Sequence, residues 1–123
     1  MEIITISSVP ELRKSVSDIM MLVKEMNYFS DEREYDLRLC LRELLQNSLN
    51  YSGYSTVKLL YEATNDYFRF SVVDKGKGFS VNICPTCPDV MSESGRGIFL
   101  VHELADFVRY NKKGTAVTVK FYY

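Results

Sequence analysis

Hydrophobic residues recur along the first half of the chain with the spacing of two amphipathic helices. After Ser8 they stand three or four positions apart, at Leu12, Val16, Ile19, Val23 and Met26. After Ser30 the same spacing returns, at Leu37, Cys40, Leu41 and Leu44. This period predicts one helix through about Tyr28 and a second helix from Ser30, each with a single apolar face.

The ends of both predicted helices carry local signals. Ser8 and Glu11 suit a capping box, and Pro10 suits the first turn of the helix that follows. The second helix begins with a capping hydroxyl and first-turn carboxylates at Ser30-Asp31-Glu32. It ends near Gly53, since glycine is able to take the left-handed position after a helix.

Five runs of β-branched, aromatic and alternating residues predict strands. They are Ile3 to Ser7, Val57 to Glu62, Tyr67 to Asp74, Phe107 to Tyr110 and Thr115 to Tyr122. Turn residues 64–66 separate the second run from the third and predict an antiparallel hairpin. Residues 80–94 are irregular and predict a loop or lid, and helical spacing resumes from Gly97 to about Asp106.

Helices that fall between hairpins, without strict β-α-β alternation, favour one fold class. We expect an α+β, two-layer α/β sandwich with a mixed, mostly antiparallel sheet rather than a doubly wound parallel sheet. With 123 residues, 46% of them hydrophobic, the chain fits a single domain over residues 1–123 with one core.

Charge and hydropathy exclude several classes of function. The net charge is −1 and acidic and basic residues are interspersed, so no basic stripe is present for direct binding of nucleic acid. The first residues are too acidic for a signal peptide, and no apolar run approaches the roughly 20 residues that span a bilayer. We therefore expect a cytoplasmic protein that does not enter the membrane.

Three cysteines are too few and too scattered for a disulfide framework. Cys84 and Cys87 have the spacing of a metal or redox pair, but a structural zinc site needs four ligands, and only Cys40 and His102 remain as candidates. A strained loop with two incidental thiols is the preferred interpretation.

Two polar residues of the second helix are candidates for chemistry. Glu43 and Asn47 are four positions apart and project from one helix face, at the edge of the apolar stripe. A carboxylate there suits a general base, and an amide oxygen suits Mg²⁺, which takes few protein ligands. An ordinary surface pair is the alternative for this motif alone.

The strand that ends at Asp74 is followed by Gly76 and Gly78. A carboxylate there is able to accept a hydrogen bond from the exocyclic amine of adenine, and glycines let the backbone approach a flat ring. Guanine presents a carbonyl at the same place and would face the carboxylate unfavourably. A tight turn with a solvated aspartate is the competing interpretation.

Two further motifs lie in the last third of the chain. In Ser94-Gly95-Arg96-Gly97 the glycines stand immediately before a predicted helix, where free backbone N–H groups receive phosphates and Arg96 adds a charged contact. Gly114-Thr115 opens the last strand with a hydroxyl that is able to reach the same base site. Each motif alone is equally compatible with a simple hinge or turn.

Taken in order, these four motifs resemble the N box and glycine boxes of the GHKL ATPases, which include histidine kinase catalytic domains and gyrase B. The resemblance covers nearly the whole chain. It implies the Bergerat ATP-binding fold, with ATP and Mg²⁺ as cofactors. It also implies roles for the motif residues: Asn47 as the Mg²⁺ ligand, Asp74 on the adenine amine, Gly76, Gly78, Gly95 and Gly97 around the base pocket and lid hinge, with Ser94 and Arg96 beside them, and Thr115 supporting the adenine.

Within that family the chain looks most like the anti-sigma factor serine/threonine kinases, on the run from Ser94 to Val101 and the Leu104-Ala105-Asp106 that follows. That likeness implies Glu43 as catalytic base, a serine of a STAS-domain anti-anti-sigma protein as substrate, a sigma factor as a second partner, and a homodimer built on the first strand and helix. Two positions depart from many relatives: Tyr51 replaces a histidine and Glu93 replaces a basic residue. Without that basic residue, Arg96 is the alternative source of a γ-phosphate contact.

Two other functions remain open from the sequence. The domain is also suited to be a non-catalytic module that binds ATP as a conformational latch and sequesters a sigma factor or another regulator. The catalytic piece of a histidine kinase fits less well, since the only histidine, His102, falls within a predicted helix, on its surface rather than as a phosphoacceptor.

Overall fold

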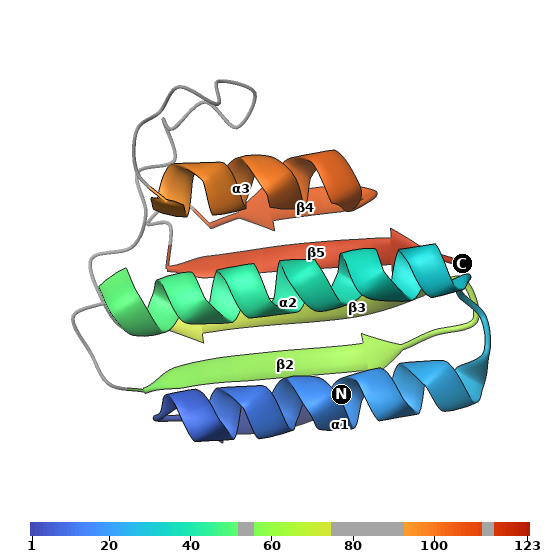
Figure 1. Cartoon of the computed structure of the whole chain (residues 1–123), viewed down its shortest axis with the longest axis horizontal. Coiled ribbons are helices and arrows are strands. Elements are labelled where there is room, and N and C mark those ends of the chain that lie inside the picture. Colours follow the sequence, from blue (N-terminus) through green and yellow to red (C-terminus); the bar gives the residue numbers. More distant parts are fainter. Residues whose placement is uncertain (52–55, 75–92, 112–114) are drawn as a thin grey trace.

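The computed structural model describes residues 1–51, 56–74, 93–111 and 115–123, and within residues 93–98 it describes the backbone alone. The elements of this part are β1 (Glu2–Ile6), α1 (Val9–Met26), α2 (Asp31–Tyr51), β2 (Val57–Ala63), β3 (Tyr67–Asp74), α3 (Glu93–Leu104), β4 (Phe107–Tyr110) and β5 (Ala116–Tyr122). Figure 1 shows α1, α2 and α3 side by side over the strands.

The strands form one five-stranded sheet in the order β1-β2-β3-β5-β4. Each of the pairings between these described strands is antiparallel, including the predicted hairpin of β2 and β3. The predicted α+β two-layer sandwich is therefore confirmed, and its sheet, predicted to be mixed and mostly antiparallel, is antiparallel at each pairing of the described strands. In this order β5 lies inside the sheet, between β3 and β4, although it is the last strand along the chain.

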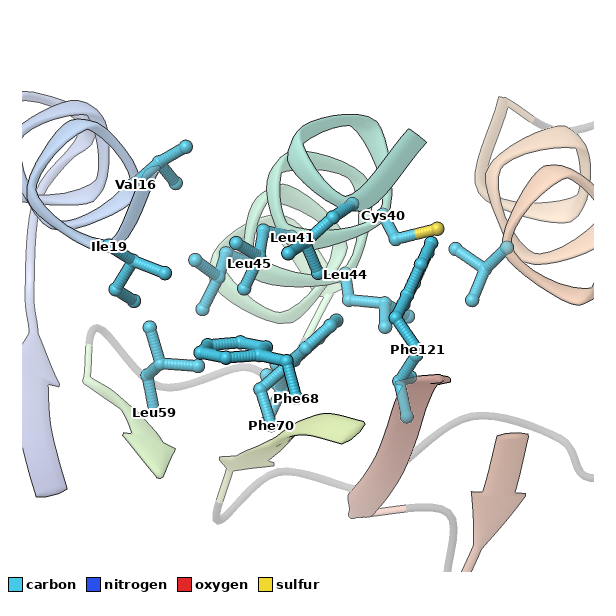
Figure 2. Packing of buried hydrophobic residues seen from close by; sticks show 14 of the residues in the cluster. Val16, Ile19, Cys40, Leu41, Leu44, Leu45, Leu59, Phe68, Phe70 and Phe121 are labelled. Atoms are coloured by element: carbon cyan, nitrogen blue, oxygen red, sulfur yellow. The ribbon is translucent and has the colours of Figure 1, made fainter. Parts of the chain in front are cut away.

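Alternation along the strands places one set of side chains beneath the helices. Phe68 and Phe70 of β3 are completely buried, whereas Arg69 between them is partly exposed. Figure 2 shows Phe68, Phe70, Leu59 and Phe121 directed toward the helices. The core thus lies between the helices and one face of the sheet, and the other face carries no helix of the described part (Figure 1).

The N-terminal helix begins and ends where its sequence signals predict. The backbone N–H of Glu11 donates to the Ser8 hydroxyl at 3.3 Å, which is the first of the two bonds of the predicted capping box. The Ser8 hydroxyl in turn donates to the Glu11 carboxylate at 3.1 Å. At the other end Asn27 takes a left-handed backbone with φ of 58° and closes the helix onto the carbonyls of Val23 and Lys24.

The central helix α2 packs against α1, α3 and the strands β2 and β3. Its buried residues Leu41, Leu44 and Leu45 point into the core between α1 and the sheet (Figure 2). The predicted cap is present, since the backbone N–H of Arg33 donates to the Ser30 hydroxyl at 3.2 Å. The helix is described through Tyr51, and the predicted stop at Gly53 lies outside the described residues.

The third helix differs from its prediction at both ends. It begins at Glu93, not at Gly97, so the glycines of the Ser94–Gly97 motif lie within its first turns rather than before it. Glycine is a poor helix former, which favoured a later start, but the first turn holds N–H groups that need no intrahelical partner. The helix ends at Leu104 because β4 begins at Phe107.

Arg33 fastens the end of α3 to α2. One guanidinium nitrogen donates to the Leu104 carbonyl at 2.9 Å, and the other donates to the Asp106 carboxylate at 2.6 Å. The guanidinium also lies 4.6 Å from the centre of the Phe121 ring. The Asp106 carboxylate in turn accepts the backbone N–H of Tyr122 at 2.8 Å. This Arg33–Asp106 clasp therefore joins α2, α3 and β5.

Two predictions fall on residues that the structure does not describe. Cys84 and Cys87 lie outside the described ranges, and so does the predicted lid except for its last two residues, which belong to α3. In the described part of the chain, no helix combines the length and the hydrophobicity needed to span a bilayer.

Candidate functional site

Several element ends meet at one end of the molecule. Figure 1 shows the last turn of α2, the end of β3, the first turn of α3 and the start of β5 together at the left of the view. The polar residues singled out in the sequence stand on these four ends: Asn47 on α2, Asp74 on β3, the Ser94–Gly97 motif on α3, and Thr115 just before β5. The fold thus gathers motifs that are far apart in sequence.

Of these residues, Asn47 gives the strongest indication of a binding site. Its side chain is only 5% exposed, and its amide nitrogen has no hydrogen-bond partner among the described residues. A buried donor without a partner costs about 1–3 kcal/mol, so native proteins rarely keep one without a reason. Glu43, one turn earlier on the same helix, remains partly exposed. The pair therefore combines a buried amide with a carboxylate that solvent reaches.

Asp74 and Thr115 are brought together by the sheet. The backbone N–H of Asp74 donates to the Thr115 carbonyl at 2.9 Å, where β3 and β5 run side by side. The Asp74 side chain is only 6% exposed and belongs to the face of β3 that turns toward the helices. The competing interpretation from the sequence, a solvated aspartate in a tight turn, is therefore wrong, because this carboxylate is buried.

Asn111 holds Thr115 in place, and sequence reasoning missed it. Its side-chain oxygen accepts the backbone N–H groups of Thr115 at 2.8 Å and of Ala116 at 3.1 Å. Its amide nitrogen donates to the Thr115 hydroxyl at 2.9 Å. An asparagine that opens a turn often bonds backbone groups of that turn, which was the available signal. Asn111 thereby fixes the rotamer of a residue predicted to face the base.

Cys40 lies beside the site but is chemically inert. It is fully buried on the flank of α2 that faces α3, as Figure 2 shows. Burial, and after it the nearby Asp36 carboxylate, raises the pKa of the Cys40 thiol to about 12. The thiol therefore stays protonated at neutral pH and acts as an apolar packing group rather than as a nucleophile.

The remaining predicted residues are placed only in part. Ser94, Gly95, Arg96 and Gly97 lie in the first turns of α3, and their side chains are not among those described. Gly76 and Gly78 lie outside the described residues. The start of α3 nevertheless directs free backbone N–H groups toward the shared end, which is the chemistry expected for an anion.

A divalent cation with few protein ligands suits this set of side chains. Over the described ranges, no three histidine, cysteine, aspartate or glutamate side chains gather so that they would hold a metal ion. Mg²⁺ bound with nucleotide phosphates keeps several waters and needs only one or two protein oxygens. Asn47 would meet that requirement with its amide oxygen, and its amide nitrogen, which has no partner among the described residues, would donate to a phosphate or water oxygen.

A two-layer α/β domain with a buried carboxylate, a buried amide and a helix start at one end of its sheet defines a class of nucleotide-binding domains. Residues 6–121 match the family model of the histidine kinase-like ATPase domain. The chain belongs to this family. The resemblance to the GHKL ATPases and the fold expected from it are confirmed, and the domain is one that binds ATP.

Proposed function

We propose that this chain is an ATP-dependent serine/threonine protein kinase that acts as an anti-sigma regulatory factor. The carrying observation is the buried, unpartnered amide of Asn47 one turn after the partly exposed Glu43. That pair supplies a cation ligand and a base on the same face of one helix. The subfamily and its partners rest on the sequence resemblance of the Ser94 to Val101 run.

The described residues that bind the nucleotide lie at the ends of two strands and two helices. Asp74 accepts a hydrogen bond from the adenine amine, and Thr115, held by Asn111, supports the base. Asn47 contributes its amide oxygen to Mg²⁺, which neutralises charge on the phosphates when it is bound. The backbone N–H groups at the start of α3 receive a phosphate.

Glu43 acts on the serine that accepts the phosphate. Its carboxylate orients the partner's serine hydroxyl and takes its proton, while a P–O bond forms to the serine oxygen and the P–O bond to the ADP leaving group breaks. A group that touches only the acceptor hydroxyl affects transfer without affecting nucleotide binding. Its role is thus separable from that of Asn47 and Asp74.

The test is transfer of γ-labelled phosphate from Mg²⁺-ATP to STAS-domain proteins of the same genome. We expect label on a partner serine, and we expect Glu43→Gln to lower transfer by about 100-fold or more, the usual size of a lost general base, with ATP affinity unchanged. Equal transfer by both proteins would refute the role of Glu43. Glu103→Gln, an exposed glutamate on α3, is the matched control and should transfer normally.

The second candidate is a non-catalytic module that uses ATP as a latch while it sequesters a sigma factor or another regulator. The buried amide and carboxylate favour nucleotide binding in either case, so they do not separate the two functions. A protein that binds Mg²⁺-ATP and its partner, with no label transferred, would favour the module.

A homodimer built on β1 and α1 is part of the proposal. Of the described strands, β1 is an edge of the sheet, so its outer backbone groups face no neighbouring strand. Exposed hydrophobic side chains lie on these two elements, with Met1 and Ile3 each 63% exposed and Leu22 39% exposed. A second copy paired along this edge would cover them.

A further inference from the structure

The groove between α1 and α2 carries a polarised set of charges that the ATP site does not use. At one end is a hollow of about 390 Å³ lined by Leu12, Val16, Arg13, Arg38 and Arg42, with Ser17. A second hollow of about 380 Å³ adjoins it and shares Ser17 and Arg38. From residue 12 to residue 24 of α1 the two extend about 18 Å along the helix.

Three arginines dominate the first hollow. Arg13, Arg38 and Arg42 are all exposed, and none of them has a carboxylate within salt-bridge distance in the part of the chain that the structure describes. Carboxylates elsewhere in the described part are paired with Lys14, Arg33 and Arg69 instead. In a chain with a net charge of −1, this is a local excess of positive charge.

The second hollow is different in character. Asp31 and Glu34 face Lys24 across it, beside Met20, Met21 and Tyr35. Met21 and Tyr35 are 62% and 61% exposed. The groove therefore has a positive end, lined by arginines, and a mixed end that is rich in methionine and tyrosine. Flexible methionine and amphipathic tyrosine are residues that adapt to a partner's surface.

We propose that this α1–α2 groove docks an amphipathic helix of a protein partner, with carboxylate side chains at the end that meets the arginines. A helix laid in a groove between two helices buries its apolar face on the accessible side chains of Met20, Met21 and Tyr35. Planar guanidinium groups bind carboxylates bidentately, which sets the direction of the bound helix.

The groove lies on the opposite flank of α2 from the ATP site. Figure 2 shows Cys40 directed toward α3 and Leu45 toward α1. Asn47 returns to the Cys40 flank after two helical turns, whereas Arg38 and Arg42 border α1. The docking proposal therefore does not depend on the proposed kinase activity, and it survives if no phosphate is transferred.

The test uses a labelled amphipathic peptide of about 18 residues, long enough for partial helicity, with leucines on one face and glutamates on its flanks. The same peptide with every glutamate replaced by lysine is the control ligand. Fluorescence anisotropy measures binding to the wild type, to Arg13→Glu/Arg42→Glu, and to Lys58→Glu/Arg109→Glu. The last protein reverses two exposed cations on strands of the same molecule, and Mg²⁺-ATP binding checks that all three proteins are folded.

We expect the acidic peptide to bind the wild type and the strand variant equally, and to bind the groove variant at least about tenfold more weakly, the size of effect seen when close charge pairs are lost. Added salt should weaken binding. No binding of the acidic peptide, equal binding of the lysine peptide, or equal affinity for the groove variant would each overturn the proposal. A groove variant with altered sedimentation in the absence of peptide would overturn it too, since a second copy would then be the occupant.

Discussion

At the scale of single residues, the Asn47 side chain lowers the stability of the ligand-free protein in favour of binding a ligand. Its amide is buried and its nitrogen finds no acceptor in the described part of the structure, so the folded protein carries a desolvation cost until a ligand arrives. Active sites commonly hold such unfavourable groups where the surrounding core fixes them.

Replacing Asn47 with leucine tests this cost. Because leucine has the same branched shape as asparagine and needs no hydrogen bond, we expect Asn47→Leu to raise the free energy of unfolding without nucleotide by about 1 kcal/mol. The same variant should lose the thermal stabilisation that Mg²⁺-ATP gives the wild type. Melting curves with and without Mg²⁺-ATP measure both effects. A variant less stable than the wild type in the absence of nucleotide would show that the amide is already satisfied.

His102 makes stability depend on pH. The sequence predicted a surface residue, but the imidazole is partly buried and lies 5.9 Å from the Tyr110 ring, centre to centre, nearly parallel to it. Burial disfavours the charged form and lowers the pKa of His102 from its ordinary 6.5. Burial also raises the pKa of Tyr110 to about 12, so both rings of the stack prefer to be neutral.

The direction in which the free energy of unfolding changes with pH follows from proton binding. As pH falls through the ordinary value, unfolded chains take up a proton at His102 while folded chains do not, so the free energy of unfolding decreases below about pH 6.5. We expect urea unfolding of the wild type to weaken between about pH 7.5 and about pH 5.5 more than that of His102→Gln. Carboxylates titrate in both proteins and cancel in the comparison. Equal pH dependence would mean that the imidazole is solvated.

At the scale of elements, the position of α3 depends on a contact from α2, a helix that is far from it in the sequence. The Arg33–Asp106 clasp holds the end of α3 against α2 and β5 by two hydrogen bonds from one guanidinium. The start of the same helix carries the motif that we propose for phosphate binding, so a shift at one end of the helix would move the other. Lysine is a poor substitute because its single ammonium does not reach both acceptors in a planar fork.

Removal of the clasp should destabilise the domain and weaken nucleotide binding together. We expect Arg33→Ala to lower the free energy of unfolding by about 1–2 kcal/mol, less than for a fully buried charge because both partners are partly exposed. Arg38→Ala, on the same helix but without an ion pair in the described part, should stay within about 0.5 kcal/mol of the wild type. Urea unfolding and ATP titration measure the two effects. Equal losses for both variants would contradict the clasp.

Local signals predicted the elements better than they predicted the contacts between them. Capping residues and alternation predicted α1, β3 and β4 closely, because these signals act within a few residues. The start of α3 was predicted too late, since the prediction rested on the helical spacing that resumes only at Gly97. Arg33 escaped notice because its acceptors are 71 and 73 residues away, beyond any spacing rule.

The candidate site shows the same division. Asp74 and Thr115 were predicted separately from turn and strand motifs, and the sheet joins them by a backbone hydrogen bond. The burial of Asp74 was not predictable, because it depends on which face of β3 the helices cover. Asn111 was not singled out, because its hydrogen bonds to Thr115 depend on the geometry of the β4–β5 pairing.

At the scale of the whole molecule, the two edges of the sheet are not equivalent. At one edge β1 presents Ile3, 63% exposed, while at the other β4 presents Phe107, 37% exposed. If the homodimer forms along β1, a charge there opposes it. We expect Ile3→Arg to weaken self-association by about tenfold or more, and Phe107→Arg to leave it unchanged. Sedimentation velocity over a range of concentrations measures both, and equal effects would refute the β1 interface.

The interior position of β5 has a consequence for biosynthesis. While the ribosome is still translating, β3 has β2 on one side and an open edge on the other, and that edge closes only when residues 116–122 emerge. Asp74 gains its bond to Thr115 at the same moment. A nascent chain therefore completes the end of the sheet that we propose for adenine only after β5 has been synthesised.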